Sequence, residues 1–220
     1  MNRRRPTLLA ALTLTATAAL TLSACGSDDD SAAKDSGKIA GADTGSETSA
    51  APSPSSTDTQ GRPKIKFPSD AKNVFEYEKT GNATKDEILA DSALSVNSVD
   101  EAIFEGSTDT KAFGFYNVEA ALSDSITYVL GYINEKHTWV GETRYFDYKV
   151  SLSGDREAYV TYCSDESKSF IKDKRTGKVM NTPTTADGYV LYNAKLAKSA
   201  EGVWQTTDIA SSRGSKKCQP

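Results

Sequence analysis

Three cysteines carry the most reactive side chains of this 220-residue chain: Cys25, Cys163 and Cys218. A cysteine becomes a nucleophile when a nearby histidine or an electropositive pocket lowers its pKa, whereas two thiols in an oxidising compartment form a disulfide. The one histidine, His137, follows a predicted helix, where a cation complements the helix dipole. We therefore expect no cysteine–histidine nucleophile, and the role of the cysteines depends on the compartment in which the chain resides.

The first 24 residues have the features of a bacterial export signal. Arginines at positions 3–5 form a basic tip, and an uncharged, mainly apolar run from Thr7 to Leu22 is followed by small residues. This run has about 16 residues, whereas a helix that remains in the membrane as a signal anchor needs roughly 20. The pattern therefore favours a signal peptide that is cleaved off over a signal anchor that stays in the membrane.

The stretch Leu22-Ser23-Ala24-Cys25 resembles the lipobox of bacterial lipoproteins, in which the cysteine becomes the new N-terminus and carries lipid. This resemblance implies that residues 1–24 are removed and that fatty acids such as palmitate on Cys25 anchor the protein at the extracytoplasmic face of the cell membrane. Several acyl chains are needed for stable anchoring, because one alone holds only marginally. In that oxidising compartment Cys163 and Cys218 remain as an even pair, and we expect them to form a disulfide.

Residues 25–66 are predicted to be a disordered linker, and residues 67–220 a single globular domain. The linker is rich in Ser, Thr, Asp and Pro and has few large apolar side chains, so it cannot offset the entropy of ordering. The formal net charge of the chain is −4. An acidic domain gains no counterion-release energy from phosphate backbones, so we expect no binding to nucleic acid.

Two helices are predicted at the start of the domain. Thr84 and Glu87 have capping-box spacing, and apolar residues recur at helical spacing until Gly106, where a helix can stop. A second periodic stretch covers 118–136, with Ser123 as a possible point of interruption. In a chain of this size such apolar stripes usually cover the protein's own core.

After Thr138 the hydrophobic period changes from helical to two, which is typical of strands. Four strands are expected, within 141–152, 158–170, 189–196 and 203–209, with a long polar loop over 172–188. Strands joined by hairpins and preceded by helices indicate an α+β fold, in which N-terminal helices pack on one face of a mainly antiparallel, four-stranded sheet.

This order of elements, with the strand Ala-Tyr-Val-Thr-Tyr-Cys at 158–163 and the Gly-Val-Trp-Gln ending at 202–205, resembles the nuclear transport factor 2-like superfamily. It is also similar to small lipoproteins of high-GC Gram-positive bacteria. The resemblance implies a bent sheet that forms a cone around the helices. Members of the superfamily use the cone's cavity for catalysis, ligand binding or assembly, and the fold does not choose among these uses.

Strand parity predicts which side chains line such a cavity. If Phe146, Tyr148 and Val150 face inward, Asp147 and Asp165 face outward, and the inward titratable groups are Tyr148, Tyr162 and Tyr192. Tyrosines alone make a poor acid–base set near neutral pH. The sequence contains no nucleophile elbow, phosphate loop or metal-ligand spacing, so we expect no cofactor or metal and assign no catalytic residue.

Two surface features leave alternatives open. Aromatic residues could form a stripe that stacks on cell-wall sugars; they are Tyr145, Tyr159, Tyr189 and Trp204. Basic residues in the long loop could contact anionic wall polymers or lipid, although Asp173 lies among them; they are Lys172, Lys174, Arg175 and Lys178. Strands favour aromatic residues in any case, and a mixed-charge hairpin tip is commonly just solvated.

The sequence favours a non-enzymatic, lipid-anchored protein whose domain binds a small ligand or an envelope protein. Two alternatives remain. The first is an isomerase-like or hydrolase-like enzyme that uses the cone cavity, and the second is an assembly module that oligomerises through the open sheet face.

Overall fold

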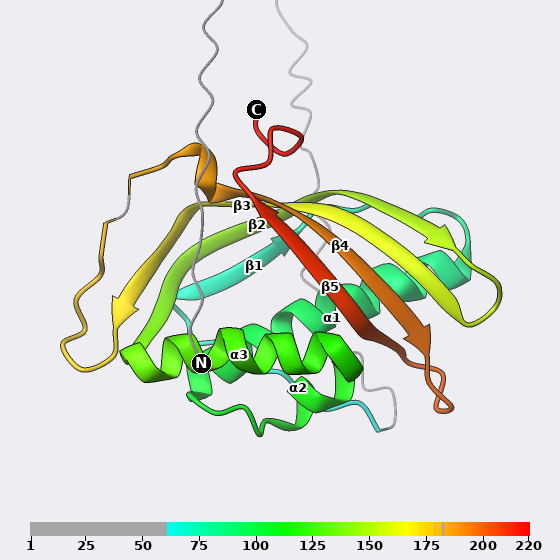
Figure 1. The fold of residues 1–220 in the computed structure, drawn as a ribbon, viewed down its shortest axis with the longest axis horizontal. Coiled ribbons are helices and arrows are strands. Elements are labelled where there is room, and N and C mark those ends of the chain that lie inside the picture. The colour runs from blue at the N-terminus through cyan, green and yellow to red at the C-terminus, as the bar shows by residue number, and fades with distance from the viewer. Residues whose placement is uncertain (1–60, 182) are drawn as a thin grey trace, which may run out of the picture. The chain divides into compact units, whose positions relative to one another are not determined.

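The computed structural model describes residues 61–181 and 183–220. Cys25, the expected signal peptide and most of the expected linker lie outside the described residues. The elements follow in the order β1 (Ala71–Phe75), α1 (Ala83–Glu105), α2 (Lys111–Tyr116), α3 (Glu119–Glu135), β2 (His137–Leu152), β3 (Glu157–Asp173), a 3-10 turn (Ala186–Gly188), β4 (Tyr189–Lys198) and β5 (Trp204–Arg213). The three helices cover one face of a curved sheet (Figure 1). The predicted α+β class is confirmed.

The sheet has five strands in the order β1-β2-β3-β4-β5, so the expected four-stranded sheet preceded by helices is wrong. The additional strand, β1, precedes the helices and pairs in parallel with β2, with Ala71 opposite Gly141. The other neighbours pair antiparallel, as predicted. Parallel strands need a long crossover connection, and here the three helices supply it.

Helix α1 ends at Gly106, as predicted, but begins earlier than the expected capping box. Its N-cap is Asn82, whose side-chain oxygen accepts a hydrogen bond from the Lys85 backbone N–H at 3.0 Å. Gly106 adopts a left-handed conformation with φ of 69° and closes the helix. Helix α3 runs unbroken through Ser123, whose hydroxyl donates to the Ala120 carbonyl at 2.9 Å.

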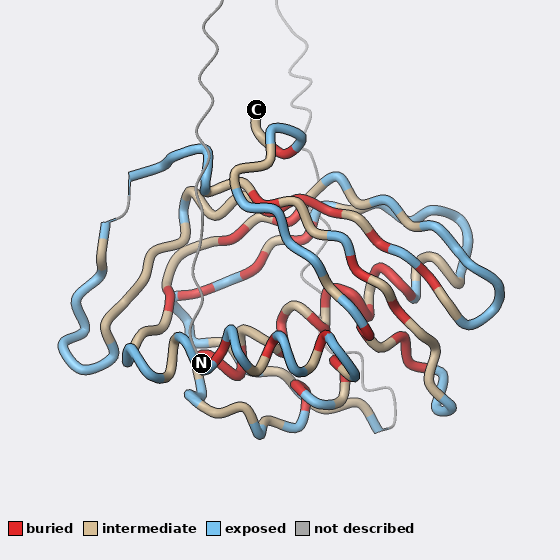
Figure 2. The backbone as a smooth tube through the Cα atoms, viewed as in Figure 1, coloured by how far each residue is buried: buried red, intermediate tan, exposed pale blue. Residues whose placement is uncertain are grey.

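The core lies between the helices and the concave face of the sheet (Figure 2). Helix α1 contributes Leu89, Ala93 and Ile103, which are buried, as the apolar stripe predicts. The sheet contributes Val160 and Trp204, which are fully buried. Within the described part of the chain, no helix is both long enough and apolar enough to span a bilayer.

A β-bulge in β2 changes which aromatic residues face the core. The register with β3 shifts between Phe146 and Lys149, and Asp147 there has a positive φ of 53°. As a result Tyr145 and Tyr148 both lie on the concave side, whereas Phe146 lies on the outer side against the Arg144 guanidinium. The predicted inward position of Phe146 and outward position of Tyr145 are therefore wrong.

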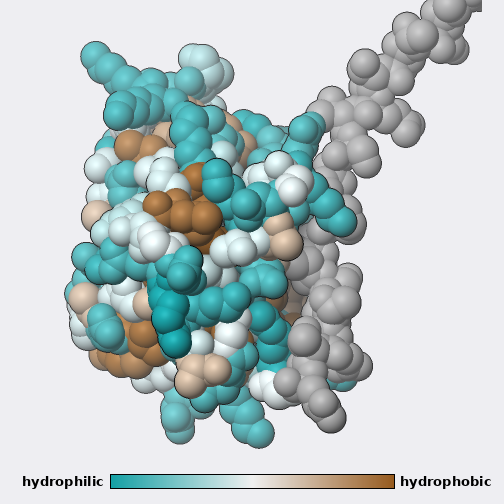
Figure 3. Space-filling model, turned by 90° about the vertical axis from the view of Figure 1, so that its right-hand side faces the viewer, coloured by the Kyte–Doolittle hydropathy of each residue, from teal (hydrophilic) through white to brown (hydrophobic). Residues whose placement is uncertain are grey.

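Cys163 and Cys218 form the expected disulfide, and both residues are buried. Cys163 lies on the outer face of β3, so the bond holds the C-terminal segment against the side of the sheet opposite the helices (Figure 1). The side that carries the β2–β3 turn shows small apolar patches among hydrophilic side chains (Figure 3).

Candidate ligand-binding site

A cavity of about 630 Å³ lies between the concave face of the sheet and helices α1 and α3. Loop residues 183–188, which precede β4, border it as well. Small-molecule sites in proteins commonly occupy about 300–1,000 Å³. The cavity is therefore large enough for an organic ligand.

Aromatic side chains form much of the lining; they are Tyr128, Tyr132, Trp139, Tyr145, Tyr162 and Tyr192. The rings of Tyr162 and Tyr192 stack with their centroids 5.0 Å apart, because these residues lie opposite each other on β3 and β4. Stacked neighbours restrict the rings, so this wall of the cavity is preorganised.

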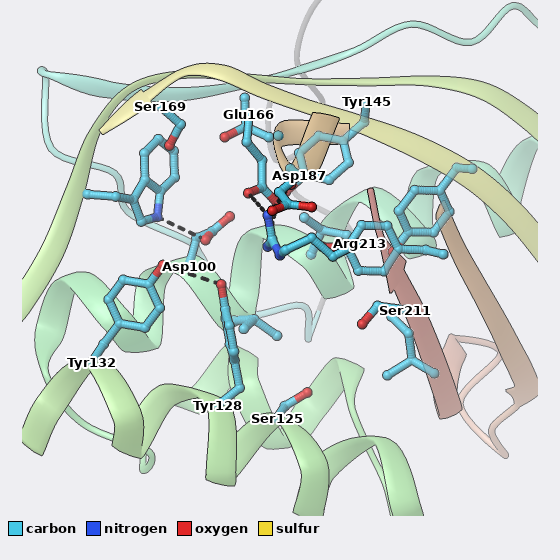
Figure 4. Close-up of a pocket in the computed structure, with 18 of the residues that line it drawn as sticks. Asp100, Ser125, Tyr128, Tyr132, Tyr145, Glu166, Ser169, Asp187, Ser211 and Arg213 are labelled. Carbon is cyan, nitrogen blue, oxygen red and sulfur yellow. Dashed lines mark hydrogen bonds and ion pairs between the residues drawn. The ribbon is translucent and has the colours of Figure 1, made fainter. Parts of the chain in front are cut away.

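Helix α1 brings one carboxylate, Asp100, to the cavity (Figure 4). Its Oδ1 accepts a hydrogen bond from Trp139 Nε1 at 3.0 Å, and its Oδ2 accepts one from Asn73 Nδ2 at 2.7 Å. Asp100 is partly accessible because it borders the cavity, but protein atoms surround it closely. This desolvation raises the pKa of Asp100 to about 7 against the opposing effect of the two hydrogen bonds.

An ion pair lies on the sheet side of the cavity (Figure 4). Arg213 on β5 donates to both carboxylate oxygens of Glu166 on β3, at 2.6 and 3.2 Å, and to the Asp187 backbone carbonyl at 2.8 Å. The hydrogen bond to Glu166 holds the pKa of Arg213 above its ordinary value. The guanidinium charge of Arg213 is thus already matched by a carboxylate.

Two tyrosines of α3 stand opposite Asp100. The hydroxyl oxygens of Tyr128 and Tyr132 are 3.4 Å apart, and both hydroxyls point into the cavity toward Asp100 (Figure 4). These residues lie one helical turn apart, so they share one face of α3. About half of the Tyr128 side chain is exposed.

The predicted cavity tyrosines occupy two places. Tyr162 and Tyr192 border the cavity between the sheet and α3. Tyr148 stacks on Tyr162 at 4.9 Å but borders a second pocket together with Tyr77 and Leu89. The three rings therefore form one stack, but two of them border the cavity and the third borders the second pocket.

Sequence reasoning missed Asp100, Glu166 and Arg213. Asp100 falls four residues after Val96 on the apolar stripe of α1, and Glu166 shares strand parity with Tyr162. Both signals were present, but only docking of α1 against the sheet brings the two side chains to one cavity. Arg213 lies beyond the predicted end of the last strand, at Ile209.

The structure bears on both surface features considered from the sequence, the aromatic stripe and the basic loop. The aromatic stripe does not form, because Trp204 and Tyr145 are buried on the inner side. In the basic loop, Lys172 pairs with Asp70 at 2.9 Å, and Lys174 donates to the Phe104 carbonyl at 2.9 Å. These two lysines therefore have partners within the domain itself.

Within residues 61–181 and 183–220, no three His, Cys, Asp or Glu side chains are grouped in a way that could hold a metal ion. The polar groups that line the cavity include Asp100, the Arg213–Glu166 pair and the phenol hydroxyls.

Asp100 should make stability depend on pH. Its pKa is higher in the folded than in the unfolded state, so the folded protein binds more protons between those values and loses stability as the pH rises toward 7. Between pH 5.5 and 8 the loss should be about 2 kcal/mol, at about 1.4 kcal/mol per pKa unit. Urea unfolding across this range checks the effect: Asp100→Asn should abolish it and the exposed Asp208→Asn should retain it, whereas parallel curves for all three proteins would contradict it.

Comparison with known proteins finds no matching family model and no matching curated protein. Among solved structures, a ketosteroid isomerase-like protein from Erwinia carotovora atroseptica has a TM-score of 0.41 and 18% identity, covering 61% of this chain and 98% of that one. A candidate ketosteroid isomerase from Shewanella frigidimarina has a TM-score of 0.31 and 14% identity, covering 56% and 94%. Because both TM-scores lie below 0.5, nothing about this chain's family, activity or ligand follows from them.

Proposed function

We propose that this domain binds a small organic molecule in the cavity between the sheet and helices α1 and α3. The observation that carries the proposal is the cavity itself: about 630 Å³, with an aromatic wall and a few polar groups that converge on it. Ligand sites typically combine a mainly apolar lining with a small number of polar groups that set orientation. Asp100 and the Arg213–Glu166 pair are such groups here.

Adjacent serines of β5 allow a matched test. Ser211 borders the cavity, whereas Ser212 lies on the opposite face of the same strand, and both are exposed. Ser211→Phe should fill part of the cavity and weaken binding of the neutral fluorescent probe N-phenyl-1-naphthylamine at least tenfold. Ser212→Phe should leave it unchanged. Equal probe binding by the native chain and both variants would show that the cavity is not the binding site.

We further propose that the domain is held at the extracytoplasmic face of the membrane by lipid on Cys25. The basic tip, apolar run and lipobox-like stretch of the sequence support this location. Cys25→Ser should move most of the protein from the membrane fraction to the medium, as measured by fractionation and immunoblotting. Retention of the variant in the membrane would instead indicate an uncleaved signal anchor.

A second candidate function is proton-transfer catalysis, which the raised pKa of Asp100 favours. A carboxyl group with a pKa of about 7 can both donate and accept a proton at neutral pH. Hydrogen–deuterium exchange of the α-protons of 4-phenyl-2-butanone, followed by NMR, tests this function. Exchange that is accelerated by the native chain and lost in Asp100→Asn would support it, and exchange at the buffer rate would contradict it.

A further inference from the structure

The lining of the cavity carries more negative than positive groups. Its acidic members are Asp100, Asp124, Glu166 and Asp187, and its one basic member is Arg213. Because Arg213 forms a two-pronged ion pair with Glu166, its charge is committed within the protein. An anionic ligand would therefore meet excess negative charge and no unmatched cation among the lining residues.

Among the described residues, no positive group is paired with Asp100 in this cavity. Within the described part of the chain, the groups that act on its carboxyl are the neutral donors of Asn73 and Trp139 and the negative charge of Glu166. Both of its oxygens are held in place by those neutral donors, at 2.7 and 3.0 Å. A positive charge within about 4–6 Å favours the ionised form of a carboxylate.

Aromatic rings surround the same point. Tyr128 and Tyr132 approach Asp100 from α3, and the Trp139 indole approaches it from β2 (Figure 4). The two tyrosines turn their hydroxyl groups toward this point, and a phenol oxygen can accept a hydrogen bond from a cationic donor. The carboxylate and the phenol oxygens thus favour the same ligand charge at one place.

We propose that the cavity ligand is an organic cation: an amine carried on an aromatic or apolar body, with its charge beside Asp100 and Tyr132 and its body along the tyrosine stack of β3 and β4. This inference rests on the proposed function and specifies its ligand class. A protonated amine can also donate hydrogen bonds to the Tyr128 and Tyr132 hydroxyl oxygens, which lie 3.4 Å from each other.

Binding should be linked to the protonation of Asp100. The charged and titratable groups around it are Glu166 and Tyr162 on β3, Arg213 on β5, Tyr128 and Tyr132 on α3, Tyr145 on β2 and Tyr192 on β4. Burial raises the pKa of Tyr132, Tyr145, Tyr162 and Tyr192, and even an unperturbed phenol has a pKa of about 10, so all of these tyrosines remain neutral near pH 7. A bound cation favours ionised Asp100, so its affinity should fall about tenfold from pH 8 to pH 6, following the ionised fraction of a group with a pKa of about 7.

Three probes with one body and different charges test the inference on the full chain by calorimetry at pH 7.5: 4-phenylbutylamine, 4-phenyl-1-butanol and 4-phenylbutyrate. The amine should bind one site at least tenfold more tightly than the alcohol, and the carboxylate should bind most weakly. Titrations in buffers of different ionisation enthalpy should show that only the amine releases protons. These measurements need no variant that could fail to fold.

Asp100→Asn should remove the preference of the amine over the alcohol, while Asp208→Asn should keep it. Alcohol or carboxylate binding as tight as that of the amine would overturn the charge assignment and leave the proposed function standing. If none of the three probes binds while N-phenyl-1-naphthylamine still distinguishes Ser211→Phe from the native chain, the cation inference alone fails. If that discrimination is absent too, the proposed function fails with it.

Discussion

Replacing Cys163 and Cys218 together by alanine should lower the free energy of unfolding by about 4 kcal/mol. The disulfide closes a loop with a sequence separation of 55 residues, and cross-linking such a loop restricts the unfolded chain by about this amount on the chain-entropy model. Both cysteines are buried, so the bond also holds the C-terminal segment against the sheet.

Urea unfolding of the oxidised full chain and of the double variant measures this difference. Cys25→Ser is the matched control, because it removes a cysteine without touching the disulfide, and it should unfold at the same urea concentration as the native chain. Reduction with dithiothreitol should shift the native chain toward the double variant and leave the double variant unchanged. A loss below about 1 kcal/mol would show that the loop contributes little to stability.

Asp91→Ala should destabilise the domain by about 3–5 kcal/mol, because it breaks a buried ion pair. The Asp91 side chain is 3% exposed, and it pairs with both terminal nitrogens of Arg62, whose side chain is 24% exposed. It also accepts a hydrogen bond from the Trp204 backbone N–H at 2.8 Å. The variant leaves the buried Trp204 N–H without its acceptor and the partly buried Arg62 guanidinium without its carboxylate.

Glu87 provides the control on the same helix. Its side chain is 53% exposed and pairs with Lys198 at 3.1 Å, and such exposed pairs contribute at most about 1 kcal/mol. Chemical unfolding should therefore separate Asp91→Ala clearly from Glu87→Ala. Similar losses in the two variants would mean that the Arg62–Asp91 pair is no stronger than an exposed one.

Local sequence signals predicted most of the secondary structure. Gly106 marked the end of α1 because few other residues adopt a left-handed backbone without strain. The four antiparallel strands followed from alternating polarity. Strand β1 escaped detection because it is only five residues long and is stabilised by pairing with β2, about 70 residues later in the chain. The resemblance to the nuclear transport factor 2-like superfamily stays a prediction.

Sequence patterns also did not predict that Arg62 and Lys66 make contacts with helix α1. Arg62 pairs with Asp91, and the Lys66 backbone N–H donates to Glu101 at 2.8 Å, although both residues precede the expected start of the domain at 67. Polar residues in a Pro-containing stretch resemble a linker by composition. Only the position of α1 gives them partners.

The sequence by itself determined the pairing of Cys163 with Cys218, the helix that ends at Gly106 and the strands that alternate in polarity, because these depend on residue counts and on neighbours in the chain. Only the tertiary structure decided which side chains line the cavity. A single bulge at Asp147 put Tyr145 on the concave side, and the docking of α1 placed Asp100 there. Strand register and helix docking are set by packing over the whole domain, so no local pattern encodes which side chains meet across the cavity.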